Sequence, residues 1–178
     1  MNRLIYMAIT AIVFLLFIQS CRVNKRAKNF NQEIQLDNIG LNFVNGAIEG
    51  DLTEIKASQL AKSHSQNPRV IRFAQMMIVD HTNADAKLRK IARDNLVSGE
   101  DVVSVTHGKM ISKLSTKSGA DFDKSYMAMM VNDHENAVKL FEGATGAENR
   151  AVQNFVKKTL PILQMHLDSA RSIDNALK

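Results

Sequence analysis

Cysteine is almost absent from the sequence: the 178 residues include one, Cys21. A single cysteine excludes a disulfide framework and a metal site built from thiolates. Proline is also scarce, with two residues, and few stretches alternate apolar and polar side chains as half-buried strands do. About 140 residues follow the N-terminal segment, enough for one domain with a substantial core. We therefore expect one all-α domain.

Acidic side chains are absent before Glu33, and this absence explains why the chain is basic overall. The formal net charge is +5, and five basic residues precede Glu33, so the remainder is neutral. These five are Arg3, Arg22, Lys25, Arg26 and Lys28. The remainder has no basic patch interleaved with aromatic residues, so nucleic acid is not an expected partner. The surplus of positive charge near the N-terminus favours export, and it would afterwards lie close to an anionic membrane surface.

Residues 1–21 have the pattern of an export signal. The apolar run Leu4–Ile18 is too short and too close to the N-terminus for a membrane span. It ends in Ile18-Gln19-Ser20-Cys21, which resembles the lipobox of bacterial lipoproteins. We expect cleavage before Cys21, lipidation of that residue, and a basic, polar tether over 22–37; the alternative is a signal anchor with an incidental cysteine. The expected location is the cell envelope, lipid-anchored to the outer membrane and facing the periplasm.

Four segments with helix signals predict a four-helix bundle over residues 38–178. They are 39–64; 68–95, after the cap Asn67-Pro68; 121–143; and a C-terminal segment that begins at a capping box, Thr145 with Glu148. A connector of about 25 residues, with a short helix near 107–114, separates the second and third segments. Such a connector can cross the bundle and leave these two helices parallel, as in ferritin-like folds. We predict a ferritin-like bundle with a long crossover between helices 2 and 3.

Two copies of one short pattern surround His81 and His134. The segments 76–88 (MMIVDHTNADAKL) and 129–141 (MMVNDHENAVKLF) share MM-x-x-DH-x-NA. Each histidine falls on an apolar stripe with the spacing of a bundle seam, and His166 and Glu54 occupy such stripes on the last and first helices. With the crossover topology these four side chains lie at similar depths, within roughly 6 Å. The sequence predicts that they meet.

The expected chemistry of this cluster has two interpretations. The first is a single metal ion bound by Glu54, His81, His134 and His166, a donor set that suits iron, copper, zinc or manganese without distinguishing them. Asp80 and Asp133 would then orient imidazoles of other helices by accepting hydrogen bonds. The second is a buried hydrogen-bond network that only fixes helix packing. Neighbouring methionines, including Met165, are either copper ligands or ordinary core residues.

Other functional signals are weak. No nucleophile beside a base, phosphate-binding loop or zincin motif occurs, so we assign no catalytic residue, and an enzyme is less expected than a non-enzymatic protein. Two hypotheses for the function stay open. The first is metal binding in envelope stress or metal handling, and the second is a structural or protein-interaction role. Protein partners and oligomeric state stay open. Gly50 indicates either close helix approach or room for a small ligand, and His107 is expected to be solvated.

Several ordered motifs resemble the proteins grouped as domain of unknown function 4142. They are Glu54-x5-Leu60-Ala61, Val70-x2-Phe73-Ala74-x5-Asp80-His81, Gly119-x2-Phe122-Asp123-x2-Tyr126, His134, and Leu160-Pro161-x4-His166-Leu167-x2-Ala170. The resemblance covers roughly residues 40–176 and implies an exported bacterial protein with a ferritin-like four-helix bundle. It implies no activity, because none is established for the family. The Glu-x-x-His motifs of di-iron ferritins are absent, which disfavours a dinuclear ferroxidase centre.

Overall fold

The computed structural model describes residues 36–98 and 101–177, and its regular elements are all helical. They are α2 (Asn38–His64), α3 (Pro68–Asp94), α4 (Val105–Ser115), α5 (Gly119–Gly143), the short 3-10 helix η1 (Ala144–Gly146) and α6 (Arg150–Ala176). The predicted all-α class is therefore confirmed. The predicted signal peptide, Cys21 and nearly all of the predicted tether lie outside the described residues.

Short polar side chains fix where the long helices begin. Asp37 and Asn67 accept hydrogen bonds from the backbone N–H groups of Gly40 and Arg69, each at 2.9 Å, and so cap α2 and α3. The start predicted for α6 is wrong, because the hydroxyl of Thr145 donates to the carbonyl of Glu142 within η1. Asn149 caps α6 instead, its side chain accepting hydrogen bonds from the backbone N–H groups of Ala151 and Val152.

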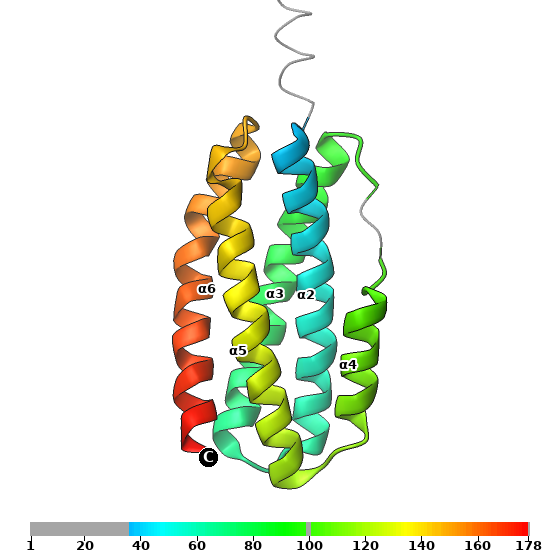
Figure 1. Cartoon of the computed structure of the whole chain (residues 1–178). Helices are drawn as coiled ribbons and strands as arrows, with labels where there is room; N and C mark the ends of the chain where they lie inside the picture. The colour runs from blue at the N-terminus through cyan, green and yellow to red at the C-terminus, as the bar shows by residue number, and fades with distance from the viewer. Residues whose placement is uncertain (1–35, 99–100, 178) are drawn as a thin grey trace, which may run out of the picture. The chain divides into compact units, whose positions relative to one another are not determined.

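The four long helices lie side by side, and α4 lies outside them (Figure 1). The helix α2 packs against α3 and α5, and α6 packs against the same two helices. Figure 1 also shows that α3 and α5 run in one direction, while α2 and α6 run in the other. The segment between α3 and α5 carries α4, which packs against α2 and α5, so the connector crosses the length of the bundle as expected. None of the described helices has the length and apolar character that crossing a membrane requires.

Two apolar clusters fill the bundle and leave a polar layer between them. The first cluster contains Phe43, Leu88, Phe141 and Phe155 among others, and the second contains Ala57, Phe73, Met130 and Ala170 among others. Each long helix contributes residues to both clusters, and one residue of the predicted set lies between these two groups along the helix. The four residues are Glu54, His81, His134 and His166. Opposite helix directions thus bring these four positions to one level.

The seam spacing that places His166 on the buried face of the last helix also predicts Ile162 there, and that position is wrong. Ile162 is 42% exposed, whereas its neighbour Leu163 is 4% exposed and packs in the first cluster. The reason is where the buried face is centred: Val152, Leu163 and Ala170 lie at its middle and Phe155 lies at its edge. Two turns of 3.6 residues from Phe155 lead to Ile162, which therefore falls just outside the face. His166 itself is buried at 1% exposure, so the placement of the histidine is unaffected.

Candidate metal site

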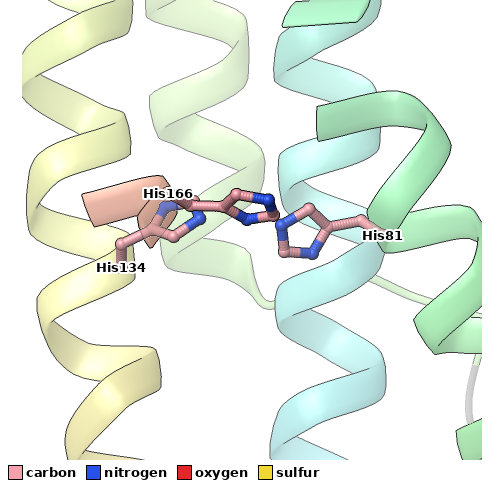
Figure 2. A group of neighbouring side chains, drawn as sticks. All are labelled: His81, His134 and His166. Carbon is pink, nitrogen blue, oxygen red and sulfur yellow. The ribbon is translucent and has the colours of Figure 1, made fainter. Parts of the chain in front are cut away.

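Three imidazoles from three helices converge in the polar layer. Figure 2 shows His81 of α3, His134 of α5 and His166 of α6 pointing toward one another. Their ring centroids are 5.5 to 5.6 Å apart, and each side chain is no more than 4% exposed. One nitrogen from each ring can be chosen so that all three lie within 4.8 Å of one another. The predicted meeting of these histidines is therefore observed.

Each of the three rings is held by a hydrogen bond at one nitrogen. His81 donates from Nδ1 to Oδ1 of Asp51 at 2.7 Å. His134 donates from Nδ1 to the carbonyl oxygen of Met130 at 2.9 Å, and His166 donates from Nε2 to Oδ2 of Asp80 at 3.0 Å. Because carboxylates and carbonyls only accept, these nitrogens must carry the proton. The tautomer of each ring, when it is neutral, is thereby fixed.

The other nitrogen of each ring has no hydrogen-bond partner among the described residues. These atoms are Nε2 of His81, Nε2 of His134 and Nδ1 of His166, and all three are buried. An imidazole that donates from one nitrogen to a carboxylate or carbonyl and keeps a lone pair on the other is the usual state of a metal-binding histidine. Nε2 of His81 reaches this state only after losing the proton that the adjacent Glu54 favours. Coordination at about 2.1 Å places neighbouring nitrogens roughly 3.4 Å apart, so nitrogens that lie within 4.8 Å of one another need to approach by no more than about 1.4 Å to bind one ion.

Glu54 lies at the edge of the three histidines. Its Oε2 is 2.8 Å from Nε2 of His81, although not in hydrogen-bonding geometry, and its Oε1 is 3.4 Å from Nδ1 of His134. The carboxylate is 3% exposed. All four predicted ligands are thus together, with an oxygen donor next to three nitrogen donors.

Asp51 is a component of the site that the sequence prediction missed. It precedes Glu54 by three residues on α2, is 7% exposed, and its Oδ1 holds the ring of His81. Residues three apart lie on the same helix face, so the Asp51-x-x-Glu54 spacing was the available signal. Its second oxygen, Oδ2, is buried with no hydrogen-bond partner among the described residues.

The two carboxylates that were predicted to orient imidazoles behave differently. Asp80 holds His166, which belongs to another helix. Asp133 instead accepts a hydrogen bond from the side chain of its neighbour Asn132 at 3.2 Å, and its Oδ2 is buried without a partner in the described part of the chain. Both carboxylates precede their own histidine by one residue and are rotated about 100° from it, so rotation alone does not separate them. Asp80 faces a histidine of another helix, whereas no imidazole among the described residues is hydrogen-bonded to Asp133, and the predicted role of Asp133 is not observed in this geometry.

Proton positions follow from burial and the arrangement of charges. Burial favours the neutral ring of His81, but the adjacent Glu54 charge and the hydrogen bond to Asp51 outweigh it and raise its pKa to about 10. Burial also opposes ionisation of Glu54, yet the imidazoles of His134 and His81 hold its pKa at about 2. Burial lowers the pKa of His134, and burial together with the charge of His81 lowers that of His166 to about 4. At neutral pH His81 is therefore protonated and the other two rings are neutral.

The predicted methionine ligands receive no support from their positions. Met165 is 51% exposed, although its neighbour His166 is buried. Met77 and Met130 are fully buried within the second apolar cluster, where they pack with Phe73 and Tyr126. The donors that converge are imidazole nitrogens and a carboxylate, rather than thioethers.

A cavity of about 410 Å³ adjoins the cluster, and His81, His166 and Glu54 line it. Gly50 also lines it, and a Cβ atom built there would meet no heavy atom within 4 Å. Of the two interpretations of Gly50, room beside the site is the one observed. His107, expected to be solvated, also lines the cavity and contacts Oε1 of Glu49 at 2.7 Å from Nδ1. This contact joins α4 to α2.

Comparison with known proteins agrees with the helical architecture. The family model described as "Domain of unknown function (DUF4142)" matches residues 25–173. The crystal structure of a DUF305 fragment from Deinococcus radiodurans resembles the chain with a TM-score of 0.69 and 13% sequence identity, over 80% of this chain and 97% of that one. At that identity the likeness concerns the fold alone. No curated protein matches the sequence.

Proposed function

The chain belongs to the DUF4142 family, whose function is unknown, and we propose that it binds one transition-metal ion through His81, His134 and His166. One observation carries the proposal: each ring is anchored at one nitrogen, and the buried second nitrogens of His134 and His166 have no hydrogen-bond partner among the described residues, while that of His81 faces Glu54. A metal ion satisfies all three nitrogens at once. Glu54 supplies a carboxylate beside them as a fourth donor.

The same observation favours metal binding over a network that only fixes packing. A buried polar atom without a partner costs about 1 to 3 kcal/mol, and two of them, Nε2 of His134 and Nδ1 of His166, gather beside the paired ring of His81. In a self-contained network these nitrogens would be paired with one another or with carboxylates. The specific support for the network is the position of His81 between Asp51 and Glu54, at 2.7 and 2.8 Å. That arrangement satisfies one ring and leaves the lone pairs of His134 and His166 unexplained.

The donor set suits zinc, iron, manganese or copper(II), which accept imidazole and carboxylate ligands. Copper(I) is less favoured, since its preferred thioether donors lie elsewhere: Met165 is half exposed. The acceptors on the far side of each ring, Asp51, the Met130 carbonyl and Asp80, would hold the ligands in place and strengthen their basicity. No catalytic role follows for these residues.

The metal content of the purified full chain tests the proposal. The protein is produced without a His-tag, from cells supplied with iron, copper, zinc and manganese, and purified in mild detergent. We expect about one equivalent of metal in the parent. The triple variant His81→Ala, His134→Ala and His166→Ala should bind none while keeping its helical circular dichroism. The matched control replaces the two histidines outside the cluster, His64 and His107, and should bind as the parent does.

No metal in the parent, even after reconstitution, would refute the proposal and leave the packing network as the better account. Equal metal content in the parent and the triple variant would mean that the ion binds elsewhere. If the triple variant has lost its helical circular dichroism, the metal content of the parent, whose own helical signal is recorded beside it, decides the question.

We further propose that a lipid on Cys21 anchors the protein to the outer membrane of a bacterial envelope, with the helical domain facing the periplasm. There it would act in metal handling or stress protection. The lipobox-like sequence and the five basic residues near the N-terminus support this location. Cys21→Ser should move the protein from the membrane fraction or block its processing. An unchanged distribution and an unchanged mass at the N-terminus would refute the anchor.

A further inference from the structure

The cavity beside the histidines leads directly to the proposed metal site. It is bordered by two of the three ligand histidines and by Glu54, and its other walls come from α2, α3, α4, α5 and α6. A volume of about 410 Å³ is within the range of small-molecule sites in proteins. His166, with its unpartnered Nδ1, and His81, with Nε2 beside Glu54, both line this space. An ion bound to them would therefore face the cavity.

Small residues on three helices keep this space open. Gly46, Ala47 and Gly50 of α2 line the cavity, together with Ala84 of α3 and Ala137 of α5. At Gly50 the space is large enough that a Cβ atom would have no neighbour within 4 Å. Glycine inside a helix costs roughly 1 kcal/mol relative to alanine, and packing gives no compensation here. A requirement for open volume next to Asp51 and Glu54 accounts for it.

The charges around the cavity are mostly negative. Five carboxylates line it: Glu49, Asp51, Glu54, Asp80 and Asp133. Among the described lining residues, Lys87 is the single lysine or arginine. Asp51 and Asp133 are 7% and 9% exposed, and each has an oxygen with no hydrogen-bond partner in the described structure. Such surroundings repel anions and accept hydrogen bonds from a ligand.

We propose that the bound metal keeps an open coordination position toward this cavity and that a small, uncharged molecule with a donor atom and an N–H or O–H group occupies it. The inference rests on the proposed metal site, where three imidazoles hold the ion and an external ligand takes either the fourth position, with Glu54 remaining on the imidazoles, or a fifth position beside Glu54. The donor atom binds the ion, and the N–H or O–H group donates to the free oxygen of Asp51 or Asp133. Anions of similar size are disfavoured by the carboxylates.

Titration of the cobalt(II)-loaded full chain with imidazole and with azide at pH 8 tests the inference. Imidazole is the uncharged probe and azide the anionic one, and both change the visible spectrum of cobalt(II) on binding. We expect a saturable change with imidazole, and azide weaker by about tenfold or more, since carboxylates within a buried site oppose a negative ligand. No spectral change with imidazole would overturn the open position. Azide binding as tight as imidazole would overturn the assigned ligand class.

Gly50→Leu provides the structural control, because its side chain would fill the cavity without meeting an atom at Cβ. It should bind cobalt(II) with unchanged stoichiometry and lose about tenfold or more in imidazole affinity. Gly143→Leu is the matched variant: its Cβ also has open space, and the residue lies at the end of α5, outside the cavity. Gly50→Leu binding imidazole as tightly as the parent would overturn the cavity route. Failure of the parent to bind cobalt or any other metal would instead refute the metal site itself.

Discussion

Replacement of Asp51 by asparagine should change metal affinity and metal-free stability in opposite directions. Asp51 holds Nδ1 of His81 at 2.7 Å and is 7% exposed, so the substitution keeps an acceptor of the same shape and removes a buried charge. A carboxylate behind a ligand histidine typically contributes 10- to 100-fold to metal affinity, or about 1.4 to 2.7 kcal/mol. We expect the metal to bind more weakly by that factor.

The stability effect follows from the pKa of Asp51, which burial raises from 3.8 to about 6 despite the hydrogen bond to His81. A raised pKa means that the folded protein binds this proton more tightly than the unfolded chain does. The group therefore favours folding most below pH 3.8, and that stability is lost as the pH rises through about 6. The difference corresponds to up to about 3 kcal/mol, so Asp51→Asn should stabilise the metal-free protein at pH 7 by as much as that.

Urea unfolding of the metal-free protein and competition with a chromophoric chelator measure the two quantities. Asp133→Asn is the matched control, since burial followed by the Glu54 charge also raises the pKa of Asp133 to about 6, while its hydrogen bond goes to Asn132. It should be stabilising too, with metal affinity changed by less than about threefold. The reasoning is refuted if Asp51→Asn destabilises the metal-free protein by more than about 1 kcal/mol and leaves metal affinity unchanged, because Asp51 would then serve packing alone.

Two further outcomes follow from the same structure. Apparent metal affinity should rise about tenfold per pH unit between pH 7 and 9, and about one proton per ion should be released in weakly buffered solution. The reason is that His81, with a pKa near 10, must lose its proton to bind, whereas His134 and His166 are already neutral. An affinity that does not change with pH, or the release of three protons, would contradict this assignment. Tyr126→Phe removes the buried hydrogen bond of 2.8 Å to Ser58 and should cost about 1 to 2 kcal/mol in urea unfolding. The loss should be the same with and without metal; a metal-dependent loss would mean that this pair is coupled to the site.

The histidines of the site could be predicted from sequence because periodicity carries most of the information. Residues at steps of three and four mark the buried face of each helix, and a polar residue on that face is conspicuous among apolar neighbours. The connector is long enough to cross the bundle, which predicted that α3 and α5 run in the same direction. That direction places His81 and His134 at one level of the bundle. Pattern and topology together were sufficient for the positions of Glu54 and the three histidines.

The remaining features depend on side-chain geometry that periodicity does not contain. Asp51 lies beside the stripe of α2, where a carboxylate is as readily solvated as buried, and only the position of His81 on α3 makes it a partner. Asp80 and Asp133 occupy equivalent places in the repeated motif, yet only Asp80 faces a histidine of another helix, because α3 and α5 have different neighbours at that level. The start of α6 was misplaced since Thr145 and Asn149 are both good caps, and the turn at η1 decides between them.

The most direct measurement of the central claim is an anomalous difference map from a crystal of the metal-loaded protein, with data collected on both sides of the absorption edge of the metal. The account predicts one peak, about 2.0 to 2.2 Å from Nε2 of His81, Nε2 of His134 and Nδ1 of His166, with Asp51 and Asp80 still bonded to the outer nitrogens. A protein that carries metal but shows its peak elsewhere, or a water molecule bridging these nitrogens in fully loaded crystals, would contradict it.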